Sequence, residues 1–228
     1  MTKHCIIGDV HGKFEVLNDF VKENQSKYDK ITQLGDMGIA FPGEKAPDVE
    51  NYDVEAEFIC GNHENYHVLK NIDNPNCWNQ NFPVNRDKYI DFFKTWDYKS
   101  RGTVENNILY IGGASSVDKH NRIPGRDWWD AENISFKEQV KVLNNIKGEQ
   151  IDIVFSHCAP LCFDIEEFLS FKRIKDPNRR FLAHIFEEVR PKMWFSGHYH
   201  QNISLTYKDC EYRCIKPIDT GDFFEIEV

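Results

Sequence analysis

Short apolar runs recur along the chain, and each ends abruptly in a polar cluster that often contains glycine. The runs are rich in β-branched and aromatic residues, which is typical of buried strands. They are His4–Gly8, Lys30–Leu34, Glu57–Cys60, Ile108–Ile111, Ile151–Phe155 and Met193–Phe195. We predict a strand at each of these runs.

Apolar residues at helical spacing separate several of the runs. One such pattern covers residues 14–21 and a second covers residues 136–146. Ser135 and Glu138 stand at the start of the second pattern in the arrangement of a capping box, with Ser135 as the N-cap. A third helix is predicted over Pro177–Arg190. Alternating strands and helices indicate an α/β fold.

The pattern changes after Gln201, where polar turns separate three short apolar runs. These are Ile203–Tyr207, Tyr212–Ile218 and Phe223–Val228, and they are typical of antiparallel strands. No internal repeat and no Pro/Gly-rich linker divides the chain. We therefore expect one domain over residues 1–228, a β-sandwich flanked by helices.

Composition narrows the class of protein. The 228 residues are 40% hydrophobic and 29% charged, as in a globular protein. The formal net charge of −9 argues against a protein that holds long nucleic acid on a basic surface. A small anionic substrate is still compatible with this charge, because bound cations reverse the sign of a site locally.

The sequence shows no pattern typical of a membrane-spanning segment, a signal peptide or a disulfide scaffold. No apolar stretch approaches the roughly 18 residues that cross a bilayer, and the first residues lack the apolar segment of a signal peptide. The seven cysteines are scattered, without a C-x-x-C pair. These features predict a cytoplasmic protein with reduced thiols and no membrane partner.

The polar clusters at the strand ends carry the candidate chemistry. In open α/β sheets, ligands bind outside the carboxyl ends of the strands, so we expect these side chains to converge. Five of the nine histidines lie in these clusters. The candidate residues are Asp9, His11, Asp36, Asn62, His63, His157, His198 and His200.

Carboxylate, amide and imidazole donors without thiolate suit Mn²⁺, Fe or Zn²⁺. The seven potential ligands other than His63 are too many for one catalytic ion, but they suit two ions that share a carboxylate. Such a pair of ions polarises a phosphoryl oxygen and positions an in-line displacement. Two divalent cations bring four positive charges and Asp9 and Asp36 remove two, which leaves a cationic site that favours phosphate.

The same residues form a recognisable set of motifs. The set is similar to that of the calcineurin-like metallophosphoesterase superfamily, in particular its small bacterial and phage members. The resemblance implies a four-layer αββα sandwich of two mixed sheets flanked by helices. The motifs are Asp9-x-His11, Gly35-Asp36, Gly61-Asn62-His63-Glu64, His157 and Gly197-His198-x-His200.

The resemblance also implies a role for each residue. One ion is held by Asp9, His11 and His200, and the other by Asn62, His157 and His198. Asp36 bridges both ions, and His63 is the general acid. The expected cofactor is a pair of divalent ions, with Mn first and Fe, Zn or Ni as alternatives.

Two features of the sequence bear on the substrate. Met37 and Gly38 follow Asp36 where protein phosphatases carry an acidic residue and an arginine, so the usual partner of His63 is missing and Glu64 is a candidate substitute. After the strand Ile108–Ile111, Arg122 and Arg126 are candidates for binding phosphate. Pairing with nearby aspartates is an equal alternative for both arginines, and a tryptophan of the pair at 128–129 is a candidate for stacking on a ring.

We therefore expect a phosphoesterase that hydrolyses phosphomonoesters or phosphodiesters through a metal-bound hydroxide. The expected partner is a small phosphorylated substrate or a phosphoprotein, and not long nucleic acid. The alternatives are a nuclease or cyclic-nucleotide phosphodiesterase, and an inert module that binds a phosphorylated ligand.

Overall fold

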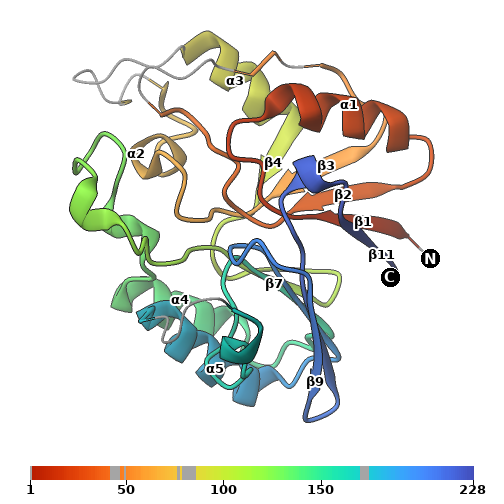
Figure 1. The fold of residues 1–228 in the computed structure, drawn as a ribbon, viewed down its shortest axis with the longest axis vertical. Coiled ribbons are helices and arrows are strands. Elements are labelled where there is room, and N and C mark those ends of the chain that lie inside the picture. Colours follow the sequence, from red (N-terminus) through yellow and green to blue (C-terminus); the bar gives the residue numbers. More distant parts are fainter. Residues whose placement is uncertain (1, 42–46, 49, 76–77, 79–85, 170–174) are drawn as a thin grey trace.

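The computed structural model describes residues 2–41, 47–48, 50–75, 78, 86–169 and 175–228. In this part of the chain the strands form two mixed sheets (Figure 1). The first sheet has the order β11-β1-β2-β3-β4, and its strands are β1 (Lys3–Ile7), β2 (Lys30–Gln33), β3 (Glu55–Phe58), β4 (Trp96–Tyr98) and β11 (Phe223–Glu227). The second has the order β5-β6-β7-β8-β10-β9, and its strands are β5 (Thr103–Glu105), β6 (Ile108–Ile111), β7 (Ile153–Ser156), β8 (Met193–Ser196), β9 (Ile203–Tyr207) and β10 (Cys210–Cys214).

Parallel pairing dominates the middle of both sheets. β1, β2, β3 and β4 are parallel, and β11 pairs antiparallel with β1, with Ile6 opposite Phe224. In the second sheet β6, β7, β8 and β10 are parallel, while β5 and β9 are antiparallel edge strands. The carboxyl ends of the central parallel strands therefore lie at one edge of each sheet.

Helices cover the outer faces of the sheets. Figure 1 shows α1 and α3 on one side of the strands, and α4 and α5 on the other. The helices are α1 (Phe14–Asn24), α2 (Tyr66–Leu69), α3 (Arg86–Thr95), α4 (Phe136–Asn145) and α5 (Pro177–Val189). The capping box at α4 is confirmed, because Ser135 Oγ accepts from the Glu138 N–H and the Glu138 carboxylate accepts from the Ser135 N–H.

Three separate hydrophobic clusters lie between the layers. Cys5 and Ile7 of β1 point toward α1, whereas Ile6 points into the space between the sheets, as the alternation of a strand requires. The second sheet packs on α4 and α5 through residues such as Val154, Leu182 and Phe186. Three clusters between four layers confirm the predicted αββα sandwich.

The C-terminal strands differ from the prediction. The predicted strand Tyr212–Ile218 begins earlier and ends at Cys214, because Pro217 has no N–H for a ladder and the Ile218 N–H donates to the backbone oxygen of Asp9. A 3₁₀ turn, Ile218–Thr220, then carries the chain to the other sheet, where β11 pairs with β1.

Some short elements were not predicted from the sequence. β4 and β5 have three residues each, too short to show a period. α3 buries only Tyr89 and Phe92, so its apolar stripe is narrow. None of the described helices is long and apolar enough to span a membrane, and the cysteines within the described ranges are free thiols.

Candidate metal centre

The loops that follow β1, β2, β3, β7 and β8 are joined by hydrogen bonds at one edge of the sandwich. In the first sheet the His11 N–H donates to the Asp36 backbone oxygen at 2.8 Å. In the second the Gly197 N–H donates to the His157 backbone oxygen at 3.1 Å. Side chains then cross between the sheets, so the loops of both sheets build one site.

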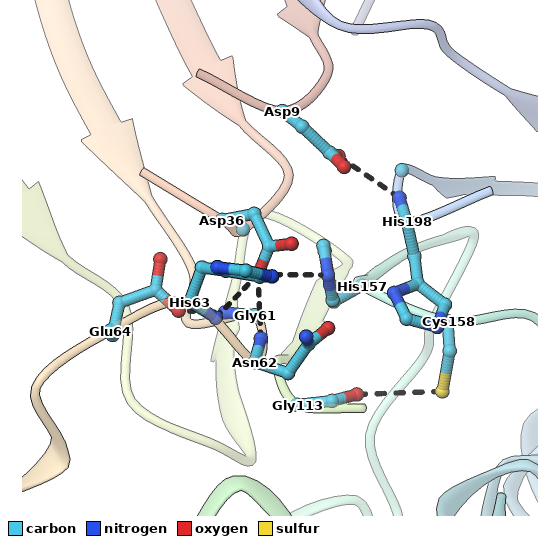
Figure 2. Close-up of polar contacts among 12 residues, drawn as sticks. Asp9, Asp36, Gly61, Asn62, His63, Glu64, Gly113, His157, Cys158 and His198 are labelled. Atoms are coloured by element: carbon cyan, nitrogen blue, oxygen red, sulfur yellow. Dashed lines mark hydrogen bonds and ion pairs between the residues drawn. The ribbon is translucent and has the colours of Figure 1, made fainter. Parts of the chain in front are cut away.

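Asp36 lies at the middle of this site, between Asn62, His63 and His157 (Figure 2). Its Oδ1 accepts from the backbone N–H groups of Asn62 at 2.6 Å and of His63 at 2.7 Å. The same oxygen is 3.2 Å from His157 Nε2, and Oδ2 is 3.8 Å from His11 Nε2. Close packing makes glycine necessary at position 61, because a Cβ there would lie 2.2 Å from Asp36 Oδ1.

Several candidate ligands have a strained backbone conformation. Positive φ angles occur at His11 (50°), Asp36 (57°), His198 (70°) and His200 (54°), which are all candidate ligands. Non-glycine residues rarely adopt this conformation, and when they do it is often at functional sites. The fold therefore holds four of the predicted ligands in a conformation that is costly for an ordinary loop.

Asp9, His11 and His200 form one group of potential metal ligands. The Nε2 atoms of His11 and His200 are 3.5 and 3.0 Å from Asp9 Oδ2, and Asp9 Oδ1 accepts from the His198 N–H at 2.9 Å. Burial raises the pKa of Asp9, but the two imidazoles outweigh it and lower this pKa to about 2. The carboxylate is thus charged, and the half-exposed His200 opens the group to solvent.

Asp36, His157 and His198 form a second, deeper group. His157 Nδ1 contacts the Leu34 carbonyl oxygen at 2.7 Å, and since that oxygen only accepts, Nδ1 is the donor and Nε2 faces Asp36. Burial lowers the pKa of His157, but Asp36 outweighs it and raises this pKa to about 10. A cation bound here would replace the proton on Nε2.

Asn62 lies beside the second group. Its Nδ2 donates to Ser116 Oγ at 3.2 Å, which turns Oδ1 away from Ser116. A further group contains His11, Asp36 and His63.

Three buried atoms of the site make no well-aligned hydrogen bond within the described residues: Asp9 Oδ2, Asn62 Oδ1 and His157 Nε2. Buried polar atoms are normally hydrogen-bonded, and leaving one unpaired costs about 1–3 kcal/mol. All three atoms belong to predicted ligands, and each of these side chains uses its other polar atom to fix its orientation. An oxygen and nitrogen donor set of this kind fits divalent cations.

His63 contacts Arg122. The Arg122 Nη2 is 3.0 Å from His63 Nε2, and a guanidinium only donates, so the imidazole nitrogen accepts. Burial lowers the pKa of His63, and Asp36 opposes this shift. The His63 ring also contacts Phe41, with 6.3 Å between ring centroids, and Phe41 packs on Trp129 at 5.7 Å.

Glu64 is not the substitute partner of His63. Its two oxygens accept from the Met37 and Gly61 N–H groups, both at 2.6 Å, so the side chain joins the loops after β2 and β3 (Figure 2 shows it beside Gly61). Arg122, which approaches from a distant segment, takes the place beside His63.

The two candidate arginines are in different positions. Arg122 is 12% exposed and lies between His63 and Asp118, whose Oδ1 is 2.8 Å from its Nη2. Arg126 is 42% exposed and pairs with Asp127 at 2.6 Å. Both arginines therefore pair with nearby aspartates, which was the alternative to phosphate binding. Arg122 also contacts His63 at the candidate centre.

Ser116 and Glu132 were not predicted to belong to the site. Both are buried, and the Glu132 carboxylate accepts from the Ser116 hydroxyl at 2.6 Å. Ser116 lies in a loop and Glu132 ends the short 3₁₀ helix Asp130–Glu132, where no hydrophobic period or motif marks a buried acid.

The comparisons with known proteins agree with this fold. The family model described as calcineurin-like phosphoesterase matches residues 3–202. The solved structure of TT1561 from Thermus thermophilus is 13% identical, with a TM-score of 0.52 over 99% of this chain and 93% of that one. The phosphopantetheinyl hydrolase of Mycobacterium tuberculosis is 10% identical, with a TM-score of 0.52 over 95% of this chain and 90% of that one. None of the curated proteins gives a significant match.

Proposed function

Because the chain belongs to the calcineurin-like phosphoesterase family, we propose that it is a phosphoesterase with a pair of divalent metal ions. It hydrolyses phosphomonoesters or phosphodiesters. The observation that carries the proposal is the set of three buried polar atoms without a well-aligned hydrogen bond in the described part of the chain, which come from Asp9, Asn62 and His157.

The donor groups divide the ligands between two ions. Asp9, His11 and His200 would hold one ion, and His157, His198 and Asn62 the other, with Asp36 shared between them. Mn²⁺ is the first choice, with Fe, Zn and Ni as alternatives for the same donors. When bound, such a pair supplies Lewis-acid activation of water and of the phosphoryl oxygens.

His63 would protonate the leaving oxygen from Nε2. In the structure this nitrogen accepts from Arg122. A phosphate is a charged acceptor and binds a guanidinium more strongly than a neutral imidazole does. Substrate binding would therefore draw Arg122 onto the phosphate and leave Nε2 free to take up, from water, the proton that it then gives to the leaving oxygen.

Two substitutions test this proposal. Asp36→Asn should remove both bound metal and activity, because the shared ligand loses its charge. His63→Gln should keep the metal and lower turnover of an alkyl phosphate by about 10²–10⁴-fold, the usual contribution of a general acid. Nitrophenyl esters should be affected much less, since nitrophenolate leaves without a proton. Full activity of His63→Gln on the alkyl ester would exclude the assigned role of His63.

The substrate class is a phosphorylated small molecule or a phosphoprotein. The net charge of −9 disfavours a nuclease that acts on long nucleic acid, but not a cyclic-nucleotide phosphodiesterase. Monoester and diester substrates compared at one Mn²⁺ concentration separate these activities. Tight Mn²⁺ binding without turnover of any phosphoester in a broad panel would instead indicate an inert binding module.

A further inference from the structure

We propose that Ser116 and Glu132 are positioning residues, which fix the side-chain amide of Asn62 so that Oδ1 faces the metal centre. This inference rests on the proposed metal centre. The side-chain amide of Asn62 carries O at one end and NH₂ at the other, and only the O can bind a cation, so the chain has to orient it.

The three side chains form a continuous buried network. Asn62 Nδ2 is 3.2 Å from Ser116 Oγ, and Ser116 Oγ is 2.6 Å from Glu132 Oε2. Glu132 Oε1 also accepts from the Ser116 backbone N–H at 2.7 Å. Asn62, Ser116 and Glu132 are 6%, 4% and 1% exposed, so water does not compete readily for these groups.

The direction of each hydrogen bond follows from the chemistry of the groups. An ionised carboxylate only accepts, so the single hydroxyl proton of Ser116 is donated to Glu132. Ser116 Oγ then has only lone pairs to offer to Asn62. The NH₂ of Asn62 satisfies these lone pairs, whereas Oδ1 in that place would face another acceptor. Glu132 therefore determines which end of the amide remains for a cation.

Glu132 is itself held in place. The Trp128 indole Nε1 donates to Glu132 Oε1 at 2.9 Å. The buried guanidinium of Arg101 binds the Glu132 backbone oxygen at 2.8 Å and the Gly112 backbone oxygen at 2.9 Å. These bonds leave the carboxylate little freedom to turn, so the orientation of Asn62 is fixed before a metal arrives.

The test is titration of the EDTA-treated full chain with Mn²⁺ by calorimetry, with stoichiometry checked by metal analysis. The wild type should bind two ions. Ser116→Ala should weaken one of the two by about 10–100-fold, the usual effect of removing a group that orients a ligand. Glu132→Gln should also weaken the binding of one of the two ions. Ser115→Ala is the matched control, because the Ser115 hydroxyl donates to Asn133, and it should leave both affinities unchanged.

A second background separates orientation from packing. A carboxylate at position 62 has an oxygen at both ends, so it needs no orientation. In an Asn62→Asp background, adding Ser116→Ala should therefore change the Mn²⁺ affinity by no more than about twofold. An equal loss in both backgrounds, an equal loss with Ser115→Ala, or unchanged binding by Ser116→Ala would overturn the inference. If the wild type bound no Mn²⁺, the proposed metal centre itself would fail.

Discussion

Three side chains of the candidate site each use one polar atom to contact the surrounding chain. His157 uses Nδ1, Asp9 uses Oδ1 and Asn62 uses Nδ2 to contact the surrounding chain, and each keeps its second polar atom for the centre. Because the partners are a backbone carbonyl, a backbone N–H and a buried hydroxyl, they move only if the loops move. The fold therefore orients the proposed ligand atoms, and a cation that binds there would not need to reorganise them.

Arg122 and Arg126 give a matched test of phosphate binding at the residue scale. Arg122→Ala should lower kcat/KM for a phosphoester by about 10–100-fold, since a hydrogen bond to a charged group contributes about 1.5–3 kcal/mol. Arg126→Ala should leave kcat/KM nearly unchanged, because Arg126 pairs with Asp127 on the surface. Steady-state kinetics on one alkyl phosphate measures both, and equal losses would contradict the distinction.

At the scale of elements, the strand-end loops are packed against each other without spare room. A Cβ on Gly61 would lie 2.3 Å from the Asp36 backbone nitrogen as well as against its carboxylate. Glu64 joins the same two loops from the other side. The loops after β2 and β3 therefore behave as one unit.

Gly61→Ala should consequently destabilise the fold by about 1–3 kcal/mol, the usual cost of overpacking, and should release bound Mn²⁺. Gly148→Ala is the control for the backbone conformation. Its φ of 82° costs about 1–2 kcal/mol with an alanine, but no heavy atom lies within 4 Å of the new Cβ. Thermal unfolding and metal analysis after dialysis measure both effects. Mn²⁺ content equal to that of the wild type in Gly61→Ala would show that the packing of these loops is not required.

The sequence predicts those elements whose pattern is local. The buried strands, α1, the cap of α4 and the gathering of polar residues at strand ends all follow from short-range periodicity and spacing. β4 and β5 are too short for such a pattern, and the pairing of β11 with β1 joins residues from opposite ends of the chain. The contacts of Arg122 with His63 and of Ser116 with Glu132 link loops and short 3₁₀ helices, so no hydrophobic period reveals them.

At the scale of the whole molecule, a buried polar network links the two sheets. Glu57 of β3 accepts from Tyr110 of β6 at 2.7 Å and from Thr32 of β2. His4 of β1 lies beside Thr32 and is 2% exposed. Burial, together with Lys30, lowers the pKa of His4 to about 3.

This pKa predicts an acid-sensitive stability. Unfolding returns His4 to its ordinary pKa of 6.5. Between pH 6.5 and pH 3 the unfolded chain therefore binds a proton at His4 that the folded chain does not bind. The contribution of His4 to the free energy of unfolding is complete above pH 6.5 and is lost as the pH falls toward 3. At pH 5 the free energy of unfolding should be lower by about 2 kcal/mol. Denaturant unfolding from pH 7.5 to pH 5 should show this loss in the wild type and a smaller one in His4→Gln. Substitution of the exposed His184 by Gln is the control, and identical profiles for wild type and His4→Gln would contradict the prediction.

The bond between Asp9 and His198 spans 189 positions of the sequence. During synthesis on the ribosome, the loop after β1 must wait until almost all of the described fold has emerged before its partner exists. Two of the candidate ligand groups, Asp9 with His11 and His200 and Asp36 with His157 and His198, combine residues from both halves of the chain. Neither of these two groups is complete before the C-terminal half has folded. We therefore expect metal loading to be a late event, and we do not expect rapid refolding from denaturant of a topology whose contacts at the site are this remote in sequence.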